Sequence, residues 1–167
     1  HIDFAPYIKD SFAIISANHE KAFLYAQSYF IQHKVPYLYD PGMSLTWIDD
    51  KDLRIGIDHC QFLIGNDYEI AQITKRLHTS VQELVSKGMG VITTLGAEGV
   101  KYEDAQQLLM VKGYKVNQLV DPTGAGDAWR GGFIGALIEG NDIEKSLTIA
   151  NALASFAVEQ QGTANHK

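Results

Sequence analysis

The stretch DPTGAGDAWRGGF, residues 121–133, places four glycines and two carboxylates around the expected start of a helix. It is not a Walker loop, because no lysine follows its glycines, nor a dinucleotide fingerprint, because Trp129 stands where the third glycine belongs. Pro122 predicts a tight entry into the helix, and Gly124 to Gly126 then present backbone N–H groups at its amino end. Such a helix end favours a phosphate or a developing anion, because its amides are unpaired and the helix dipole is positive there.

Asp127 lies inside this stretch, where an anion site makes a carboxylate unfavourable unless it has a chemical role. It is placed to accept a proton from a hydroxyl while the neighbouring amides receive a phosphoryl group. Alternatively, it only complements the dipole in the first turn of the helix. Gly131, Gly132 and Gly135 give the same helix a bare face, which close helix packing explains as well as a ligand does.

Along the chain, short apolar segments alternate with segments of helical periodicity. This alternation predicts an α/β fold with a mostly parallel sheet and helices on both of its faces. Strands are expected at 12–16, 35–39, 61–64 and 91–95, followed by a hairpin of 99–103 and 107–111. A helix is expected at 20–33 with Asn18 as N-cap, and another has an acidic first turn of Asp49, Asp50 and Asp52. Further helices are expected at 67–77, 79–87, 126–139 and 142–160.

Composition limits the classes of protein to consider. The 167 residues suffice for one domain with a core, and no apolar run approaches the roughly 20 residues of a membrane span. The net charge of −6, with no basic cluster beyond Lys75 and Arg76, argues against nucleic acid and anionic membrane as partners. The amino terminus lacks the pattern of a secretory signal. The single cysteine, Cys60, suits a reducing, cytoplasmic compartment and is expected to be a buried structural thiol.

Two further motifs follow expected strands, where parallel sheets collect their ligands. Thr94 to Gly99 offers glycine amides and a hydroxyl to phosphate oxygens, although a plain strand-to-hairpin turn also explains it. Asn66 and Glu69 could orient Mg²⁺ and water near a triphosphate. They also fit a capping box with Asn66 at the N-cap. Taken singly, each motif has a purely structural explanation.

Together and in this order, the three motifs resemble those of the ribokinase-like (PfkB) family of carbohydrate and nucleoside kinases. The residues from Asp121 to Asp127 with Gly131-Gly132-Phe133 resemble the family's carboxy-terminal signature. Asn66 to Glu69 is similar to its N-x-x-E motif, and Thr94 to Gly99 to its T-x-G-x-x-G turn. The turn Asp40-Pro41-Gly42 and residues 159–163 are more similar to the adenosine-kinase-like and general sugar-kinase branch.

The resemblance implies an ATP-dependent kinase that transfers the γ-phosphoryl group to a hydroxyl of a small-molecule sugar or nucleoside. Mg²⁺ would be required, and K⁺ or another monovalent cation often binds near the signature in this family. The base would be Asp127, with the anion hole formed by Gly124, Ala125 and Gly126. The nucleotide would be bordered by Asn66, Thr94, Gly96, Gly99 and Asn151, the last of these near the adenine. Mg²⁺ would be held through water by Glu69, and the monovalent cation by Asp121 and Thr123.

The resemblance also has departures. Family members are longer, and their amino-terminal half carries a glycine-glycine motif, most acceptor-binding residues and a small β-lid. The chain opens on His1 without a Met, so residues 1–167 are expected to be the carboxy-terminal nucleotide-binding and catalytic part of such a domain. Trp129 replaces a commoner phenylalanine and is interpreted as packing. A nucleotide-binding module without catalysis remains the alternative. A flavodoxin-like regulatory domain would need a phospho-acceptor at a strand end, and Asp40 is a poor candidate for that role.

Overall fold

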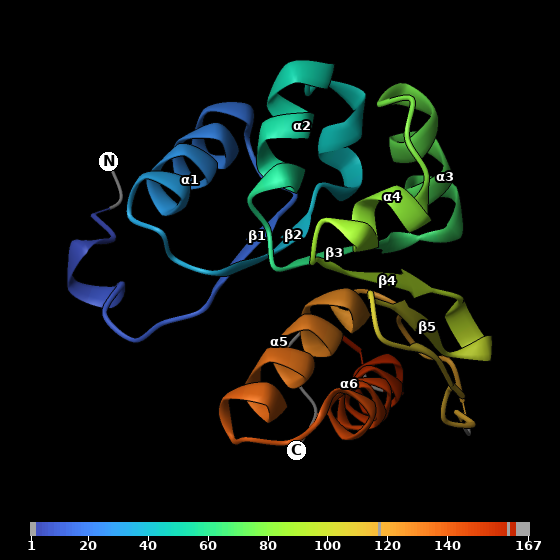
Figure 1. The fold of residues 1–167 in the computed structure, drawn as a ribbon. Helices are drawn as coiled ribbons and strands as arrows, with labels where there is room; N and C mark the ends of the chain where they lie inside the picture. The colour runs from blue at the N-terminus through green and yellow to red at the C-terminus, as the bar shows by residue number, and fades with distance from the viewer. Residues whose placement is uncertain (1–2, 117, 160, 163–167) are drawn as a thin grey trace. The chain divides into compact units, whose positions relative to one another are not determined.

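The structure is a computed structural model that describes residues 3–116, 118–159 and 161–162. Six strands form one sheet in the order β1-β2-β3-β4-β5-β6. Parallel pairing joins β1 to β2, with Ala13 opposite Tyr37, and β2 to β3, with Leu38 opposite Phe62. The strands are β1 (Ala13–Ser16), β2 (Tyr37–Asp40), β3 (Phe62–Asn66), β4 (Gly90–Thr94), β5 (Val100–Glu103) and β6 (Leu108–Val111). The fold is therefore α/β with a mostly parallel sheet, as the sequence predicts (Figure 1).

The helices also appear where the apolar periodicity predicts them, with ends that differ by a few residues. They are α1 (Glu20–Gln32), α2 (Asp50–Asp58), α3 (Asp67–Arg76), α4 (Val81–Ser86), α5 (Ala125–Ile138) and α6 (Ile143–Val158). Three short 3₁₀ helices, η1 (Ala5–Tyr7), η2 (Gly42–Thr46) and η3 (Gly96–Glu98), lie in connections. The chain divides into two compact units, the first His1–Thr93 with Tyr102–Leu108 and the second Thr94–Lys101 with Leu109–Lys167.

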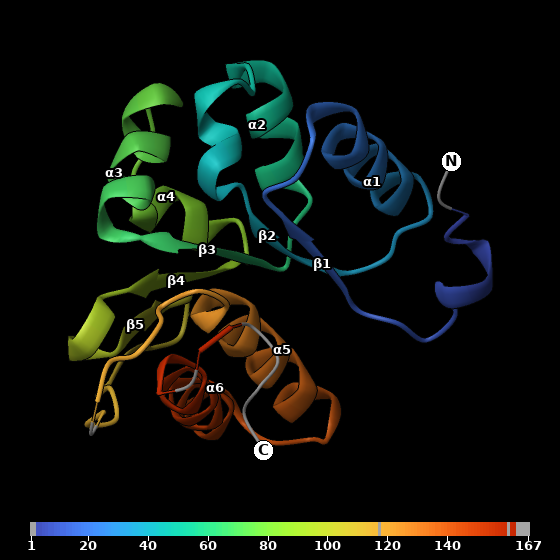
Figure 2. The same ribbon diagram turned by 180° about the vertical axis from the view of Figure 1, so that it is seen from behind.

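In the first unit, α1 to α4 all lie on one side of strands β1 to β3 (Figures 1 and 2). Buried tyrosines of β2 join the sheet to the helices that cover it. The Tyr37 hydroxyl donates to the Gly56 carbonyl at 2.6 Å, and the Tyr39 hydroxyl donates to Gln27 Oε1 at 2.8 Å. Gln27 in turn donates to the Asp52 carbonyl at 2.9 Å, so each polar atom of this network is paired inside the core. Burial raises the pKa of both tyrosines.

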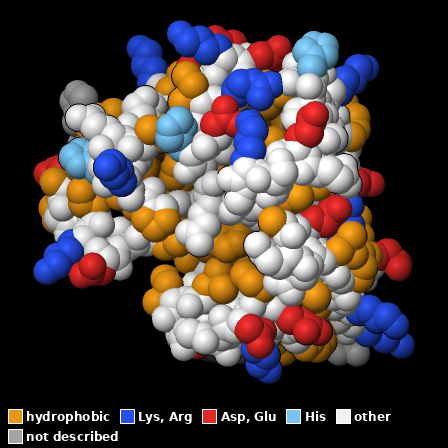
Figure 3. Space-filling view, in the orientation of Figure 1, with side chains coloured by type: hydrophobic (Ala, Val, Ile, Leu, Met, Phe, Trp, Pro, Cys, Tyr) orange, Lys and Arg blue, Asp and Glu red, His pale blue; other side chains and the backbone are white. Residues whose placement is uncertain are grey.

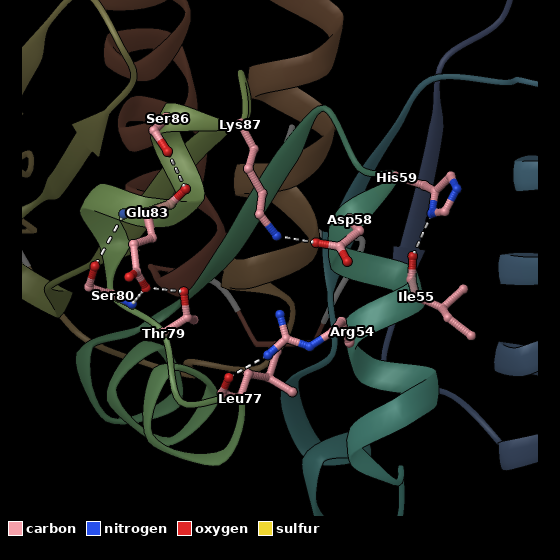
Figure 4. A network of polar contacts seen from close by, with 10 residues as sticks. All are labelled: Arg54, Ile55, Asp58, His59, Leu77, Thr79, Ser80, Glu83, Ser86 and Lys87. Atoms are coloured by element: carbon pink, nitrogen blue, oxygen red, sulfur yellow. Dashed lines mark hydrogen bonds and ion pairs between the residues drawn. The ribbon is translucent and has the colours of Figure 1, made fainter.

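Polar side chains close the helix ends of the first unit (Figure 4). Ser80 and Glu83 form a capping box at the start of α4, and the Thr79 hydroxyl donates to the same Glu83 carboxylate at 2.7 Å. These hydrogen bonds, from Thr79 first and then Ser80, lower the pKa of Glu83. Lys87, just beyond α4, forms an ion pair of 2.8 Å with Asp58 at the end of α2. Both ends of α4 are thus tied by side chains.

Two local expectations can be compared directly with the structure. Asn18 is not the N-cap of α1: the helix begins at Glu20, so His19 holds that position, and Asn18 Oδ1 accepts from the His19 amide instead. Cys60 is buried, which confirms the expected structural thiol, and burial raises the pKa of its sulfhydryl. The turn Asp40-Pro41-Gly42 leads directly into η2.

In the second unit, α5 and α6 lie side by side (Figures 1 and 2). A Cβ atom on Gly132 would lie 2.6 Å from Leu153 Cδ1 and 3.3 Å from Ala150 Cα of α6. At Gly131 and Gly135, by contrast, a Cβ would meet no described atom within 4 Å. Close helix packing therefore explains Gly132 but leaves the other two glycines of the bare face unexplained.

Charged side chains of both signs share the visible surface. On the face shown in Figure 3, Lys and Arg side chains are interspersed with Asp and Glu. Among the residues described, no helix is both long and apolar enough to cross a bilayer.

Candidate functional site

The signature turn has the tight geometry that its glycines predict. Gly124 is the N-cap of α5 and has a left-handed backbone, with φ 85° and ψ −6°, a conformation that glycine adopts at little cost. The Ala125 amide donates to the Pro122 carbonyl at 3.3 Å. For the amides of Gly126 and Asp127, the described part of the chain supplies no acceptor. The turn therefore presents free N–H groups at the positive end of a helix of 14 residues.

Asp127 lies in the first turn of α5 with 75% of its side chain exposed. Arg130, one turn further along the same face, forms an ion pair with it through Nη2 and Oδ1 at 2.5 Å. Only 16% of the arginine side chain is exposed, and a Cβ on Gly126 would lie 3.4 Å from its Nη1. The guanidinium therefore lies beside both the carboxylate and the glycine turn. The sequence reasoning did not single out Arg130, although the spacing of three residues from Asp127 was a usable signal.

Asp121 fixes the start of the turn to the end of α6. Its Oδ1 accepts from the Thr123 amide at 2.9 Å, and its Oδ2 accepts from the Gly162 amide at 3.1 Å. Hydrogen bonds from the Thr123 hydroxyl and amide, and then from Gly162, lower the pKa of the carboxyl group. The two residues predicted to hold a monovalent cation are thus neighbours in one hydrogen-bonded turn.

The second unit contains a cavity of about 490 Å³ between this turn and the Thr94–Gly99 motif. Its lining is mainly apolar side chains and backbone, contributed by both motifs, by α5 and α6, and by Gly113, Tyr114, Val116 and Leu119. The cavity brings together six of the residues nominated from the sequence: Thr94, Gly96, Gly99, Ala125, Gly126 and Asn151. It also includes Tyr114 and Trp129, which the sequence reasoning did not assign to a site.

One wall of the cavity depends on a close approach of two backbone segments. Gly99 has φ 102°, and a Cβ on it would lie 2.1 Å from the Val111 carbonyl oxygen. A Cβ on Gly113 would lie 2.5 Å from the Ala97 carbonyl oxygen, and the Gly113 amide donates to the Glu98 carbonyl at 3.3 Å. Only glycine fits either position, so the T-x-G-x-x-G turn packs tightly against residues 111–113 at the end of β6. Gly113 could not be predicted from the sequence, because its contact with Ala97, which is distant in the chain, and not a local pattern, requires a glycine there.

Trp129 and Asn151 meet in another wall. The Trp129 indole Nε1 donates to Asn151 Oδ1 at 2.8 Å, and Asn151 Nδ2 donates to the carbonyls of Val111 and Lys112 at 3.2 and 3.1 Å. Both residues are buried, and the Trp129 ring stacks on Phe133 with centroids 5.3 Å apart. Interpreting Trp129 as packing alone missed this bond. A buried indole N–H needs a partner, and that requirement was the available signal.

Asn66 and Glu69 lie in the first unit and form the capping box that the sequence allowed. Asn66 Oδ1 accepts from the Glu69 amide, and Glu69 Oε2 accepts from the Asn66 amide, both at 2.8 Å. A Cβ on Gly65 would lie 3.2 Å from that carboxylate oxygen, so the glycine leaves room for it. Across the described residues, no group of three or more His, Cys, Asp and Glu side chains could hold a metal ion. The Mg²⁺ role of this pair remains a prediction.

Comparison with known proteins identifies the family. The family model described as pfkB family carbohydrate kinase matches residues 7–167. The chain belongs to this family. The finer placement in an adenosine-kinase-like branch stays a prediction, and of residues 159–163 on which it partly rests, Gln160 and Thr163 lie outside the described residues.

Several pfkB relatives are kinases of nucleosides or sugars. A nucleoside kinase of Methanothermobacter thermautotrophicus is 36% identical over 127 residues, which are 75% of this chain and 40% of that protein. A nucleoside kinase of Methanocaldococcus jannaschii is 32% identical over 124 residues, 74% of this chain and 41% of the relative. A ribokinase of Bacillus subtilis is 31% identical over 130 residues, 78% and 42% of the two chains. The chain thus spans less than half the length of these relatives.

Solved structures of the family have the same fold. The Burkholderia thailandensis nucleoside kinase in complex with ADP-inosine superposes with a TM-score of 0.91 at 25% identity, over 98% of this chain and 52% of that one. The M. jannaschii nucleoside kinase superposes with a TM-score of 0.85 at 26% identity, over 97% and 56%. The ribokinase-like fold expected from the sequence is confirmed.

Proposed function

We propose that this chain provides the nucleotide-binding and phosphoryl-transfer part of an ATP-dependent kinase whose acceptor is a hydroxyl of a nucleoside or sugar. The observation that carries the proposal is the cavity of the second unit. It joins the glycine turn before α5 to the Thr94–Gly99 motif, and Asp127 lies one residue beyond its lining. Membership of the pfkB family supports the same activity.

The cavity suits a nucleotide. Its volume of about 490 Å³ lies within the range of roughly 300–1,000 Å³ found for small-molecule sites, and its apolar walls fit a flat base. Two of its glycines have open space beside them: no described atom lies within 4 Å of a Cβ built on Gly96, and a Cβ on Gly126 would meet only the Arg130 guanidinium. In the proposal, Thr94, Gly96 and Gly99 border the nucleotide. Gly124, Ala125 and Gly126 receive its terminal phosphate.

ATP, when bound, supplies the γ-phosphoryl group. Asp127 takes the proton of the acceptor hydroxyl as the hydroxyl oxygen bonds to the γ-phosphorus and the bond to the leaving phosphate oxygen breaks. Its exposed carboxylate is accessible to an acceptor, and Arg130 holds that carboxylate in place. The N–H groups of the glycine turn and the positive end of α5 stabilise the negative charge on the transferring group.

The proposal includes two cation sites. Glu69 would hold Mg²⁺ through water with Asn66 beside it, because its Oε1 takes no part in the capping box. Mg²⁺ is commonly bound by one or two carboxylates together with water, and Glu69 supplies one carboxylate. K⁺ or another monovalent cation would lie at the turn of Asp121 and Thr123.

The test is transfer of labelled phosphate from ATP to a panel of nucleosides and sugars by the intact natural protein. Inosine comes first, because a related nucleoside kinase was solved with it. Asp127→Asn keeps an acceptor for Arg130 but removes the base, so turnover should fall by about 10²–10⁴-fold with ATP affinity nearly unchanged. Asp58→Asn, which removes an ion-paired carboxylate outside the site, is the matched control and should keep turnover.

Two results would contradict the proposal. Full turnover in Asp127→Asn would show that Asp127 only complements the helix dipole. Saturable ATP binding by the intact protein, with no transfer to any member of the panel, would favour the alternative of a nucleotide-binding module without catalysis.

A further inference from the structure

The cavity contains one polar side-chain pair that the proposed chemistry does not use. We propose that Trp129 and Asn151 are positioning residues that hold segment 111–113 against α5 and α6 and thereby set the affinity of the cavity for its nucleotide. The inference rests on the proposed function in one respect: it takes the cavity to be the nucleotide site. The hydrogen bonds of the pair, however, are observed independently of any ligand.

The orientation of the Asn151 carboxamide follows from its partners. An indole N–H can only donate, so the atom that faces Trp129 Nε1 must be the amide oxygen. The carbonyls of Val111 and Lys112 can only accept, so the atom that faces them must be the amide nitrogen. All three contacts agree on one orientation. Asn151 therefore links α5, α6 and the carboxyl end of β6 through a single side chain.

This arrangement changes the role expected of Asn151. Its amide nitrogen already donates to two backbone carbonyls, so a ring nitrogen or carbonyl of a base would have to compete with them for this donor. It lines the cavity, but its bonds are made with the protein. A positioning role follows better from these contacts than direct contact of its amide N–H groups with the adenine.

The segment that Asn151 holds is fixed from two directions. Gly99 and Gly113 pack the backbone of residues 111–113 against the 97–99 turn so closely that neither position has room for a Cβ. Asn151 binds the carbonyls of Val111 and Lys112, which belong to the same segment. Gly113 and Tyr114 line the cavity immediately afterwards. Loss of the Asn151 bonds would remove the hydrogen bonds that join this wall to α6.

Trp129 contributes the bond that a phenylalanine cannot make. In Trp129→Phe the aromatic ring can still stack on Phe133, but Asn151 Oδ1 loses its donor within a buried site. A buried polar atom without a partner is unfavourable, so the carboxamide is expected to turn and weaken its bonds to segment 111–113. The change removes the donor with little loss of packing, which makes it the sharpest single substitution.

The experiment measures the dissociation constant for ADP by isothermal titration calorimetry, with the melting temperature of each variant measured beside it. Trp129→Phe should weaken ADP binding by about 5- to 10-fold, and Asn151→Ala by at least about 10-fold. Because the two residues act as one unit, the double variant should bind no more weakly than Asn151→Ala alone. Trp47→Phe and Asn141→Ala are matched controls outside the cavity. They should leave the ADP dissociation constant within about 2-fold of the wild type, although Asn141 also donates to a backbone carbonyl.

Different results would contradict different claims. A wild-type protein that binds no ADP would contradict the proposed function. A wild type that binds ADP, with Trp129→Phe and Asn151→Ala lowering only the melting temperature, would overturn the positioning role while leaving the proposed function intact. Effects that multiply in the double variant would show that the two residues do not act as a pair.

Discussion

The adjacent glycines of α5 predict opposite effects of the same substitution. Gly131→Ala and Gly132→Ala each gain the helix propensity of alanine, about 1 kcal/mol. At Gly131 the new methyl group meets no described atom within 4 Å, so this gain should appear as added stability. At Gly132 the methyl would lie 2.6 Å from Leu153 Cδ1 and 3.3 Å from Ala150 Cα, well inside the usual contact distance of roughly 3.5–4.0 Å.

The packing cost at Gly132 can be isolated by comparing the two variants, because the propensity gain cancels. Overpacking of this kind costs about 1–3 kcal/mol. We expect a cost in the lower part of that range, because Leu153 is 38% exposed and its side chain can turn away. Some cost remains, because the α6 backbone at Ala150 must shift. The assay is urea unfolding followed by Trp129 fluorescence in a Trp47→Phe background. A Gly132→Ala variant as stable as Gly131→Ala would refute the close packing of α5 on α6.

Three further substitutions test the turns around the cavity. Gly99→Ala, with φ 102° and a Cβ 2.1 Å from the Val111 carbonyl oxygen, should lose about 3 kcal/mol or more of stability. Gly96→Ala, strained only by its φ of 58°, should lose about 1–2 kcal/mol of stability. Equal losses of the two variants in urea unfolding would contradict the close backbone approach at Gly99. Asp121 has a lowered pKa in the folded protein, so its contribution is present at neutral pH and is lost as the pH falls through that pKa. The stability difference between wild type and Asp121→Asn should therefore shrink below about pH 4, and a difference that stays constant with pH would exclude this linkage.

The sequence predicts the order of the elements well because hydrophobic periodicity and helix caps are local signals. Every expected strand and helix is present, and Asp50 and Asp52 lie in the first turn of α2 as expected, while Asp49 is its N-cap. The errors are also local: Asn18 lies one residue too early to cap α1, and η1 has no periodicity to reveal it.

The candidate site is predictable only in part. The glycine turns were identified because their patterns are short and contiguous. Trp129 with Asn151 and Gly99 with Val111 are contacts between residues far apart in the chain, and no local pattern specifies which residues meet. The pairing of Asn66 with Glu69 left two interpretations open. The structure shows the capping box, which neither requires nor excludes a role near a metal ion.

The central claim, that the cavity of the second unit binds the nucleotide, can be tested by nuclear magnetic resonance. The chain has two tryptophans, Trp47 and Trp129, so their indole N–H signals can be followed separately during a titration with ATP. We expect the Trp129 signal and the amides of Gly96, Gly99 and Gly126 to shift together with one affinity, while the Trp47 signal stays unchanged. Saturable ATP binding that leaves the Trp129 signal in place would contradict it.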